Sequence, residues 1–219
     1  MIPINIEQVC ELFQVPCLTE LTGQHVTNIT MDSRACIEQS LFVAIKGEQS
    51  DGHDFIESAI EHGAICIVVD KHSNIQKDNV CVIVVDDTVL AMGKLAKLMM
   101  DQFNGLVVSL TGSCGKTTTK QMIAAICETS FNTQATAGNF NNYIGVPLTV
   151  FSVEKAHEVL VVELGANAKG EIEYLNQIVN PNISILLNAS AAHLDGFEDL
   201  ESVIKTKGEI ITSANEKCS

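Results

Sequence analysis

The sequence predicts an α/β protein with parallel sheets, organised as a small first domain followed by a domain that contains a glycine-rich loop. Strand-like and helix-like segments alternate along the chain, which is the pattern of βαβ units. Several segments of strand length are continuous runs of Val, Ile and Leu, as in strands buried on both faces of a sheet. One such run leads into TGSCGKTT (111–118), which is followed by a helical pattern.

The first domain is predicted to span residues 1–85. Its strands are expected at 24–31, 40–46, 64–70 and 80–86, and its helices at 5–13 and 54–62. The last two strands, AICIVVD and VCVIVVD, are almost entirely apolar. Polar, turn-rich segments separate the elements, notably DSRACIEQ (32–39) and GEQSDGHD (47–54).

The second domain is predicted to span residues 86–219 and to begin with a connecting helix at 87–103. Further strands are expected at 106–110, 157–165 and 182–188, and further helices at 117–129, 171–179 and 200–211. Strands that alternate with helices in this way favour a parallel sheet.

Composition excludes several classes of partner. The 219 residues carry a formal net charge of −14, which argues against binding to nucleic acid or to anionic membranes. No apolar run approaches the roughly 18 residues that a membrane span needs, and the N-terminus lacks a basic leader region. The eight cysteines are scattered without CxxC pairs, so we expect reduced thiols and a cytoplasmic protein.

The glycine-rich loop is the strongest functional motif in the chain. A buried strand, the pattern GxxGK[ST] at 112–117 and a helix follow one another. Glycines allow backbone N–H groups to surround phosphate oxygens, and the helix N-terminus favours negative charge. Lys116 would neutralise the outer phosphates and the Thr117 hydroxyl could hold Mg²⁺. The alternative, a chance glycine-rich turn, does not require this strand–loop–helix context.

Two more residues at strand ends are candidate metal ligands. Glu163 ends the apolar run VLVV, and a carboxylate in that position is costly unless it is paired or metal-bound. His193 follows the strand expected at 182–188, and a neutral imidazole can ligate a divalent metal. A solvated strand-end glutamate and a structural histidine are the alternatives.

Five segments together resemble the ATP-dependent muramyl ligases of peptidoglycan synthesis. They are TGSCGKTT (111–118), TAGNFNNYIGVPLT (136–149), VVELGAN (161–167), AAHLDGF (191–197) and KTKGEI (205–210). The first domain is similar to the UDP-substrate domain of that family, through ITMDSRACIEQSLFVAIKGEQSDGHDF (29–55). The ELGAN and AAHLDGF strings favour the member that adds D-alanyl-D-alanine to UDP-N-acetylmuramoyl-tripeptide.

The resemblance implies a role for each matching residue of the second domain. The ATP-phosphate loop would comprise Gly112, Ser113, Cys114, Gly115, Lys116, Thr117 and Thr118. Thr117 and Glu163 would hold one Mg²⁺, and His193 a second. Lys207 matches a lysine that the family carbamylates into a metal ligand, and Lys205 is the rival candidate. Lys116, His193 and Lys207 are thus the implied catalytic residues.

Substrate contacts are implied in both domains. Those matching the family's UDP contacts, or lying near them, are Ser33, Arg34, Lys46, Asp51, Gly52 and His53. Arg34 is the only arginine in the chain, and a guanidinium can pair with a diphosphate through two hydrogen bonds. Asn139 and Asn142 lie where the family approaches the reacting groups.

The implied function is an ATP-dependent, amide-bond-forming ligase of cell-wall precursor synthesis that works through an acyl phosphate. Members of the family have three domains, so the resemblance predicts that the second domain is incomplete at its C-terminus and that the isolated chain is inactive. The alternative is a P-loop nucleotide-binding module or a kinase-like NTPase without ligase activity. Such a protein has no need of the DSR and DGHD loops of the first domain.

Overall fold

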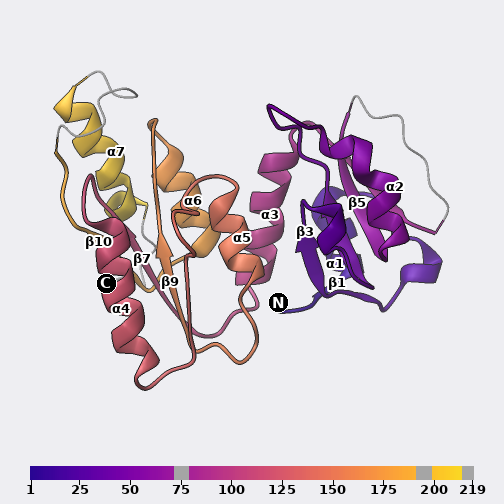
Figure 1. Ribbon diagram of the computed structural model, residues 1–219, viewed down its shortest axis with the longest axis horizontal. Coiled ribbons are helices and arrows are strands. Elements are labelled where there is room, and N and C mark those ends of the chain that lie inside the picture. The colour runs from indigo at the N-terminus through magenta and orange to yellow at the C-terminus, as the bar shows by residue number, and fades with distance from the viewer. Residues whose placement is uncertain (72–78, 191–198, 214–219) are drawn as a thin grey trace. The chain divides into compact units, whose positions relative to one another are not determined.

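The computed structural model describes residues 1–71, 79–190 and 199–213 (Figure 1). The chain divides into two compact units, Met1–Met99 and Met100–Ser219. The sequence analysis placed this boundary near residue 85, before the helix α3 (Thr88–Met100). Almost all of α3 instead belongs to the first unit, where Leu90, Ala91 and Lys94 line a cavity of about 440 Å³ together with Leu12 and Phe13.

A parallel four-stranded sheet forms the centre of the first unit, in the order β3-β4-β5-β6. Its strands are β3 (Asn28–Thr30), β4 (Ser40–Val43), β5 (Ala64–Asp70) and β6 (Cys81–Val85). The α-helices that accompany α3 in this unit are α1 (Ile6–Phe13) and α2 (Ile56–Glu61). Short 3₁₀ turns occupy Thr19–Leu21, Ser33–Ala35 and Gly52–Phe55. The expectation of a parallel sheet is therefore confirmed for this unit.

One predicted strand of the first unit is wrong. Residues 24–31 form two short strands in different sheets: β2 (His25–Val26) pairs antiparallel with β1 (Ile4–Asn5), whereas β3 pairs with β4. Val26 and Ile29 are both buried although they are three positions apart. A single strand would point them to opposite faces. The chain buries both because it passes from one sheet to the other at Thr27, whose N–H donates to the Gln39 carbonyl at 3.0 Å.

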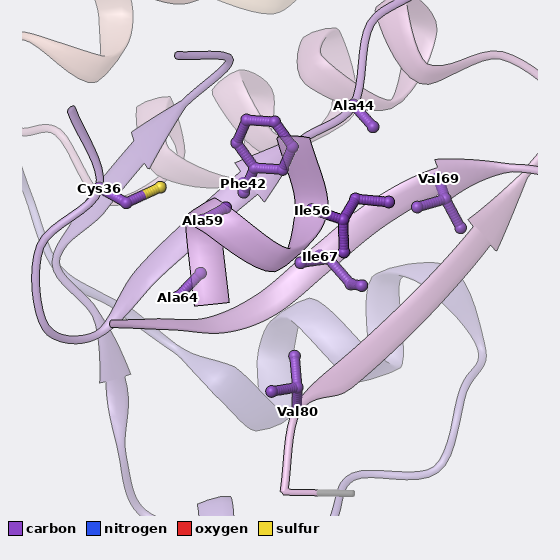
Figure 2. Close-up of a cluster of buried hydrophobic side chains, with 9 residues drawn as sticks. All are labelled: Cys36, Phe42, Ala44, Ile56, Ala59, Ala64, Ile67, Val69 and Val80. Atoms are coloured by element: carbon purple, nitrogen blue, oxygen red, sulfur yellow. The ribbon is translucent and has the colours of Figure 1, made fainter. Parts of the chain in front are cut away.

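The core of the first unit lies between the sheet and α2, as Figure 2 shows. Phe42 from β4 and Ile67 from β5 are fully buried there, against Ile56 and Ala59 of α2. The Val- and Ile-rich composition of β5 follows from its position, because a central strand of a covered parallel sheet has no solvent face. The same packing holds the polar loops at the carboxyl ends of β3 and β4.

A second parallel sheet forms the second unit, in the order β10-β7-β9-β8. Its strands are β7 (Leu106–Thr111), β8 (Thr133–Ala135), β9 (Val159–Glu163) and β10 (Ile183–Leu186). Helix α4 (Lys116–Glu128) packs on β8 and β9, α6 (Glu171–Val179) packs on α7 (Leu200–Thr212), and α7 also contacts β10. In the described part of the chain, no helix is both long and apolar enough to cross a bilayer.

The sequence analysis missed two elements of the second unit, β8 and α5 (Gly145–Phe151). Strand β8 has the sequence TQA, so it contains no apolar run from which a strand could be predicted. Helix α5 begins with Gly145 and contains Pro147. The proline lies in the first turn of the helix, where its missing N–H breaks no intrahelical hydrogen bond.

Phe42→Ala should lower the free energy of unfolding of the first unit by about 3–5 kcal/mol, because it leaves a cavity in a fully buried cluster. Chemical denaturation measures the difference. The matched control is Phe55→Ala, which removes the same ring from a position that is 45% exposed. Equal losses in the two variants would contradict the assignment of Phe42 to the core.

Candidate functional site

The glycine-rich loop of the second unit leaves a row of backbone N–H groups available. It connects β7 to α4, and Gly115 adopts a φ of 82° immediately before the helix. Within the described residues, the N–H groups of 115–118 have no hydrogen-bond acceptor, whereas the N–H of Thr119 donates to the Gly115 carbonyl at 2.9 Å. Unpaired N–H groups at the start of a 13-residue helix form a site for an anion.

Lys116 lies folded over the same loop. Its ammonium donates to the carbonyl of Gly112 at 2.8 Å and lies 3.5 Å from that of Ser113. Gly112 packs closely against the residue that follows β10, since an added Cβ would lie 3.0 Å from the Cβ of Leu187. The cation is therefore held beside the free N–H groups, where it can meet an anion without a large movement of its side chain.

Asn188, which the sequence analysis did not single out, holds the loop from the end of β10. Its side-chain oxygen accepts from the N–H groups of Ser113 and Cys114, both at 3.1 Å, and its side-chain nitrogen donates to the Cys114 carbonyl at 3.0 Å. The Ser113 hydroxyl donates to the Ser190 carbonyl at 3.1 Å. These bonds fix the first half of the loop and leave the N–H groups of its second half free.

Glu163 is a buried carboxylate at the end of β9, only 1% exposed. One of its oxygens accepts from the Thr117 hydroxyl at 3.1 Å, and the other accepts from the Asn141 amide at 2.8 Å. The ammonium of Lys120 lies 3.8 Å from the first oxygen. The predicted pair of Thr117 and Glu163 is thus adjacent in the structure.

The sequence analysis missed Asn141 and Lys120, and the sequence contains a signal for one of them. Lys120 shares the sheet-facing stripe of α4 with Ile123, Ala124 and Cys127, so the helical period places a lysine in the interior. Asn141 stands in an irregular segment with no such period. An added Cβ on Gly165 would lie 2.7 Å from the Asn141 side-chain oxygen, so that glycine makes room for the contact with Glu163.

The donors around Glu163 suit a hard divalent cation. A carboxylate and a hydroxyl are oxygen ligands of the kind that Mg²⁺ prefers, and Mg²⁺ usually keeps waters and substrate phosphates as its other ligands. Within the described ranges, no group of three or more His, Cys, Asp or Glu side chains could hold a metal by itself. His193, which the resemblance gives as a ligand of a second ion, lies outside the described residues.

The structure distinguishes the two candidate lysines of α7. Lys207 is 5% exposed, and its ammonium lies 3.4 Å from the Ala166 carbonyl. Burial, with the nearby charge of Lys116, lowers the pKa of Lys207 below its ordinary value. Lys205 instead lies in solvent and pairs with Glu201 at 2.6 Å. Lys207 is thus a buried amine with a lowered pKa, whereas Lys205 is an exposed, ion-paired one.

Two acidic side chains fix the loop that follows β9. Glu171 accepts from the N–H groups of Asn167 and Ala168 at 2.6 and 3.3 Å. Glu209 from α7 accepts from the N–H groups of Gly170 and Glu173 at 2.8 and 3.2 Å, and so caps α6 from another helix. The sequence analysis assigned no role to either residue.

Asn139 and Asn142 differ in their surroundings. Both are exposed. The side-chain oxygen of Asn142 accepts from the N–H groups of Ile144 and Gly145, at 3.2 and 2.9 Å, so this residue helps to start α5. The described contacts place neither residue beside Glu163, and their assignment to the reacting groups stays a prediction.

Arg34 is presented to solvent in the first unit. Its guanidinium makes two hydrogen bonds to Asp32, at 2.9 and 2.7 Å, while its side chain remains 85% exposed. This pairing lowers the pKa of Asp32 to about 2. Ser33 is buried in the same turn. The arginine is thus oriented by its neighbour and accessible to an anionic ligand.

The remaining predicted substrate residues of the first unit form one loop. Asp51 accepts from the backbone N–H and the ring Nδ1 of His53, at 3.0 and 2.6 Å, and lies 4.0 Å from the Lys46 ammonium. The backbone N–H of Asp70 donates to His53 Nε2 at 3.2 Å. Gly52 approaches Ile45 so closely that an added Cβ would lie 2.6 Å from its backbone nitrogen. This loop is therefore tightly fixed to the ends of β4 and β5.

Replacing Arg34 should raise the pKa of Asp32. In Arg34→Gln the ion pair is lost, so the Asp32 pKa should move from about 2 towards the ordinary value of about 3.9. Because the pKa is lowered in the folded chain, the stabilisation by this pair is present above about pH 4 and disappears as the pH falls towards 2. Carboxyl NMR titration measures the pKa, and the internal reference is Asp199, whose pKa is lowered by hydrogen bonds from Ser202 and does not depend on Arg34.

Comparison with known proteins gives matches along most of the chain. Residues 110–218 match the Mur ligase middle domain, and residues 25–101 match the domain described as Mur ligase family, catalytic domain. The UDP-N-acetylmuramoyl-tripeptide–D-alanyl-D-alanine ligase of Haemophilus influenzae is 40% identical over 214 residues, which are 96% of this chain and 46% of that protein.

Solved structures give the same result. MurF from Acinetobacter baumannii matches with a TM-score of 0.84 and 32% identity, over 98% of this chain and 47% of that one. MurF from Thermotoga maritima in complex with ADP matches with a TM-score of 0.80 and 35% identity, over 88% of this chain and 44% of that one. The chain therefore spans about half the length of the relatives that it matches.

Proposed function

Because this chain belongs to the Mur ligase family, we propose that it serves the ATP-dependent addition of D-alanyl-D-alanine to UDP-N-acetylmuramoyl-tripeptide. The observation that carries the proposal is the pairing of Thr117 with the buried Glu163, beside a loop with free N–H groups and Lys116. The relatives named for this reaction support the choice of substrates. The product is a peptidoglycan precursor, and we place its synthesis in the cytoplasm.

The second unit would bind ATP. Its N–H groups at 115–118 and the Lys116 ammonium would meet the phosphates, as supported by the ADP complex of the Thermotoga maritima relative. Thr117 and Glu163 would hold Mg²⁺, with His193 and a carbamylated Lys207 as the proposed ligands of a second ion. The metal would supply positive charge to stabilise the transferring phosphoryl group.

The first unit would bind the UDP end of the muramoyl substrate. The guanidinium of Arg34 is exposed and already oriented by two hydrogen bonds to Asp32, which suits bidentate pairing with a diphosphate. Lys46 is a second exposed cation, beside the fixed loop of Asp51, Gly52 and His53. A diphosphate would compete with Asp32 for the same donors of Arg34.

The proposed reaction proceeds through two transfers. The terminal carboxylate of the tripeptide attacks the γ-phosphorus of ATP, the bond to ADP breaks, and an acyl phosphate forms. The amine of D-alanyl-D-alanine then attacks the carbonyl carbon, and phosphate leaves from a tetrahedral intermediate. Lys116 and the loop N–H groups counter the negative charge that accumulates on the phosphoryl oxygens.

The alternative is a P-loop module or kinase-like NTPase that binds nucleotide without forming an amide bond. Such a protein would need only the second unit, which contains the glycine-rich loop. The ligase proposal needs the first unit as well, and relatives with the ligase name match across both units. Binding of the UDP-linked tripeptide therefore discriminates between the two functions.

Lys116→Ala should weaken binding of Mg-ATP by roughly a hundredfold or more, because a hydrogen-bonded charge contact to phosphate is lost. The fold should persist, since the side chain lies over the loop and outside the core. Isothermal titration measures the affinity and circular dichroism the fold. Lys205→Ala, which removes an exposed lysine, is the control. Unchanged affinity in Lys116→Ala would contradict the phosphate-loop assignment.

Arg34→Ala should weaken binding of UDP-N-acetylmuramoyl-tripeptide by roughly ten- to a hundredfold, the usual effect of losing hydrogen bonds to a charged partner. Titration calorimetry with the UDP-linked substrate measures it. Lys94→Ala changes the net charge equally at an exposed position of α3 and should leave the affinity unchanged. If neither the wild type nor the variants bind this ligand, the NTPase alternative is favoured.

A further inference from the structure

Lys120 is a buried cation to which the proposed reaction assigns no role. It is 3% exposed and faces the sheet from α4, on the same stripe as Ile123 and Ala124. Lysine is almost never fully buried without a partner, because an ammonium loses its hydration on entering the interior. Its position therefore needs an explanation in terms of the groups around it.

Two acceptors surround the Lys120 ammonium. It donates a hydrogen bond to the Gly138 carbonyl at 2.7 Å, and it lies 3.8 Å from one carboxylate oxygen of Glu163. The hydrogen-bond donors to that carboxylate, Thr117 and Asn141, are neutral. Among the residues that the structure describes, Lys120 is the cation within ion-pair distance of Glu163.

We propose that Lys120 is a positioning residue, the resident counter-ion that holds Glu163 in its ligating position until a divalent cation takes over its charge. The ion pair itself does not depend on the proposed metal site. Only the replacement of the ammonium by a divalent cation rests on the proposed function. A buried carboxylate without a counter-charge is strongly unfavourable, so Glu163 needs a cation even when no metal is bound. With the metal in place, the ammonium keeps its bond to Gly138 and so links α4 to the segment 136–142.

A double-mutant cycle with Lys120→Gln and Glu163→Gln tests the ion pair. Glutamine at 120 can still donate to Gly138 but carries no charge. Each single variant leaves one buried charge unpaired, so each should lower the midpoint of thermal unfolding by about 5–10 °C. The double variant should be more stable than the sum of the two losses predicts.

Two further variants keep the cycle interpretable. Lys120→Arg retains the charge and should recover most of the lost stability. Lys205→Gln removes an exposed lysine and should show no coupling to Glu163→Gln. Strictly additive losses for Lys120→Gln and Glu163→Gln would overturn the proposal. They would mean that Lys120 stabilises the fold through its hydrogen bond to Gly138 and not through Glu163. If a single variant does not fold but the double variant does, the pair is confirmed by compensation.

Titration with MgCl₂ alone at pH 8 tests whether Mg²⁺ replaces the Lys120 ammonium as the counter-ion of Glu163. Removal of the ammonium takes away a repelling cation, so Mg²⁺ should bind Lys120→Gln several-fold more tightly than wild type and raise its unfolding midpoint by more. Glu163→Gln should show no such rise. Equal shifts in wild type and Lys120→Gln would overturn the exchange. Coupling in the cycle without any Mg²⁺ effect would leave the counter-ion in place and contradict the proposed metal site.

Discussion

The second unit is arranged around one constraint, the burial of a carboxylate at the tip of a parallel strand. Glu163 is only 1% exposed, and its carboxylate is surrounded by two hydrogen-bond donors and one cation. Thr117 and Lys120 come from α4, Asn141 comes from the segment before α5, and the backbone N–H of Glu163 itself donates to the Thr136 hydroxyl at 3.1 Å. Three separate stretches of chain are therefore brought together at one acidic group.

The two units use their strand ends differently. In the second unit, free N–H groups at 115–118 follow the carboxyl end of β7, and the buried carboxylate of Glu163 lies at the end of β9. In the first unit the corresponding ends carry exposed cations on rigid turns, Arg34 above all. Ligands of parallel sheets collect at this edge. Anionic ligands suit each of these strand ends by itself, because each unit offers positive charge only locally on an acidic chain.

The sequence predicted the strands and helices with long, regular patterns, and it failed where the pattern was short. The apolar run of β5 and the glycine-rich loop before α4 were sufficient because burial and backbone geometry leave few alternatives. Strand β8, with three polar or small residues, depends on its neighbour β9 for its existence. Asn141 contacts a residue 22 positions away, and Asn188 contacts residues 74 and 75 positions away. Local periodicity cannot predict contacts between residues so far apart in the sequence.

The environment of Lys207 bears on its proposed carbamylation. An amine must be neutral to attack carbon dioxide, and burial together with the charge of Lys116 moves the pKa of Lys207 downward. The negative charges of Glu171 and Glu209 oppose that shift, and both carboxylates accept hydrogen bonds from backbone N–H groups at the start of α6. The same two residues fix the loop whose Ala166 carbonyl contacts Lys207. Glu171 and Glu209 thus stabilise the start of α6 and the loop beside Lys207, while their charges act against the lowering of its pKa.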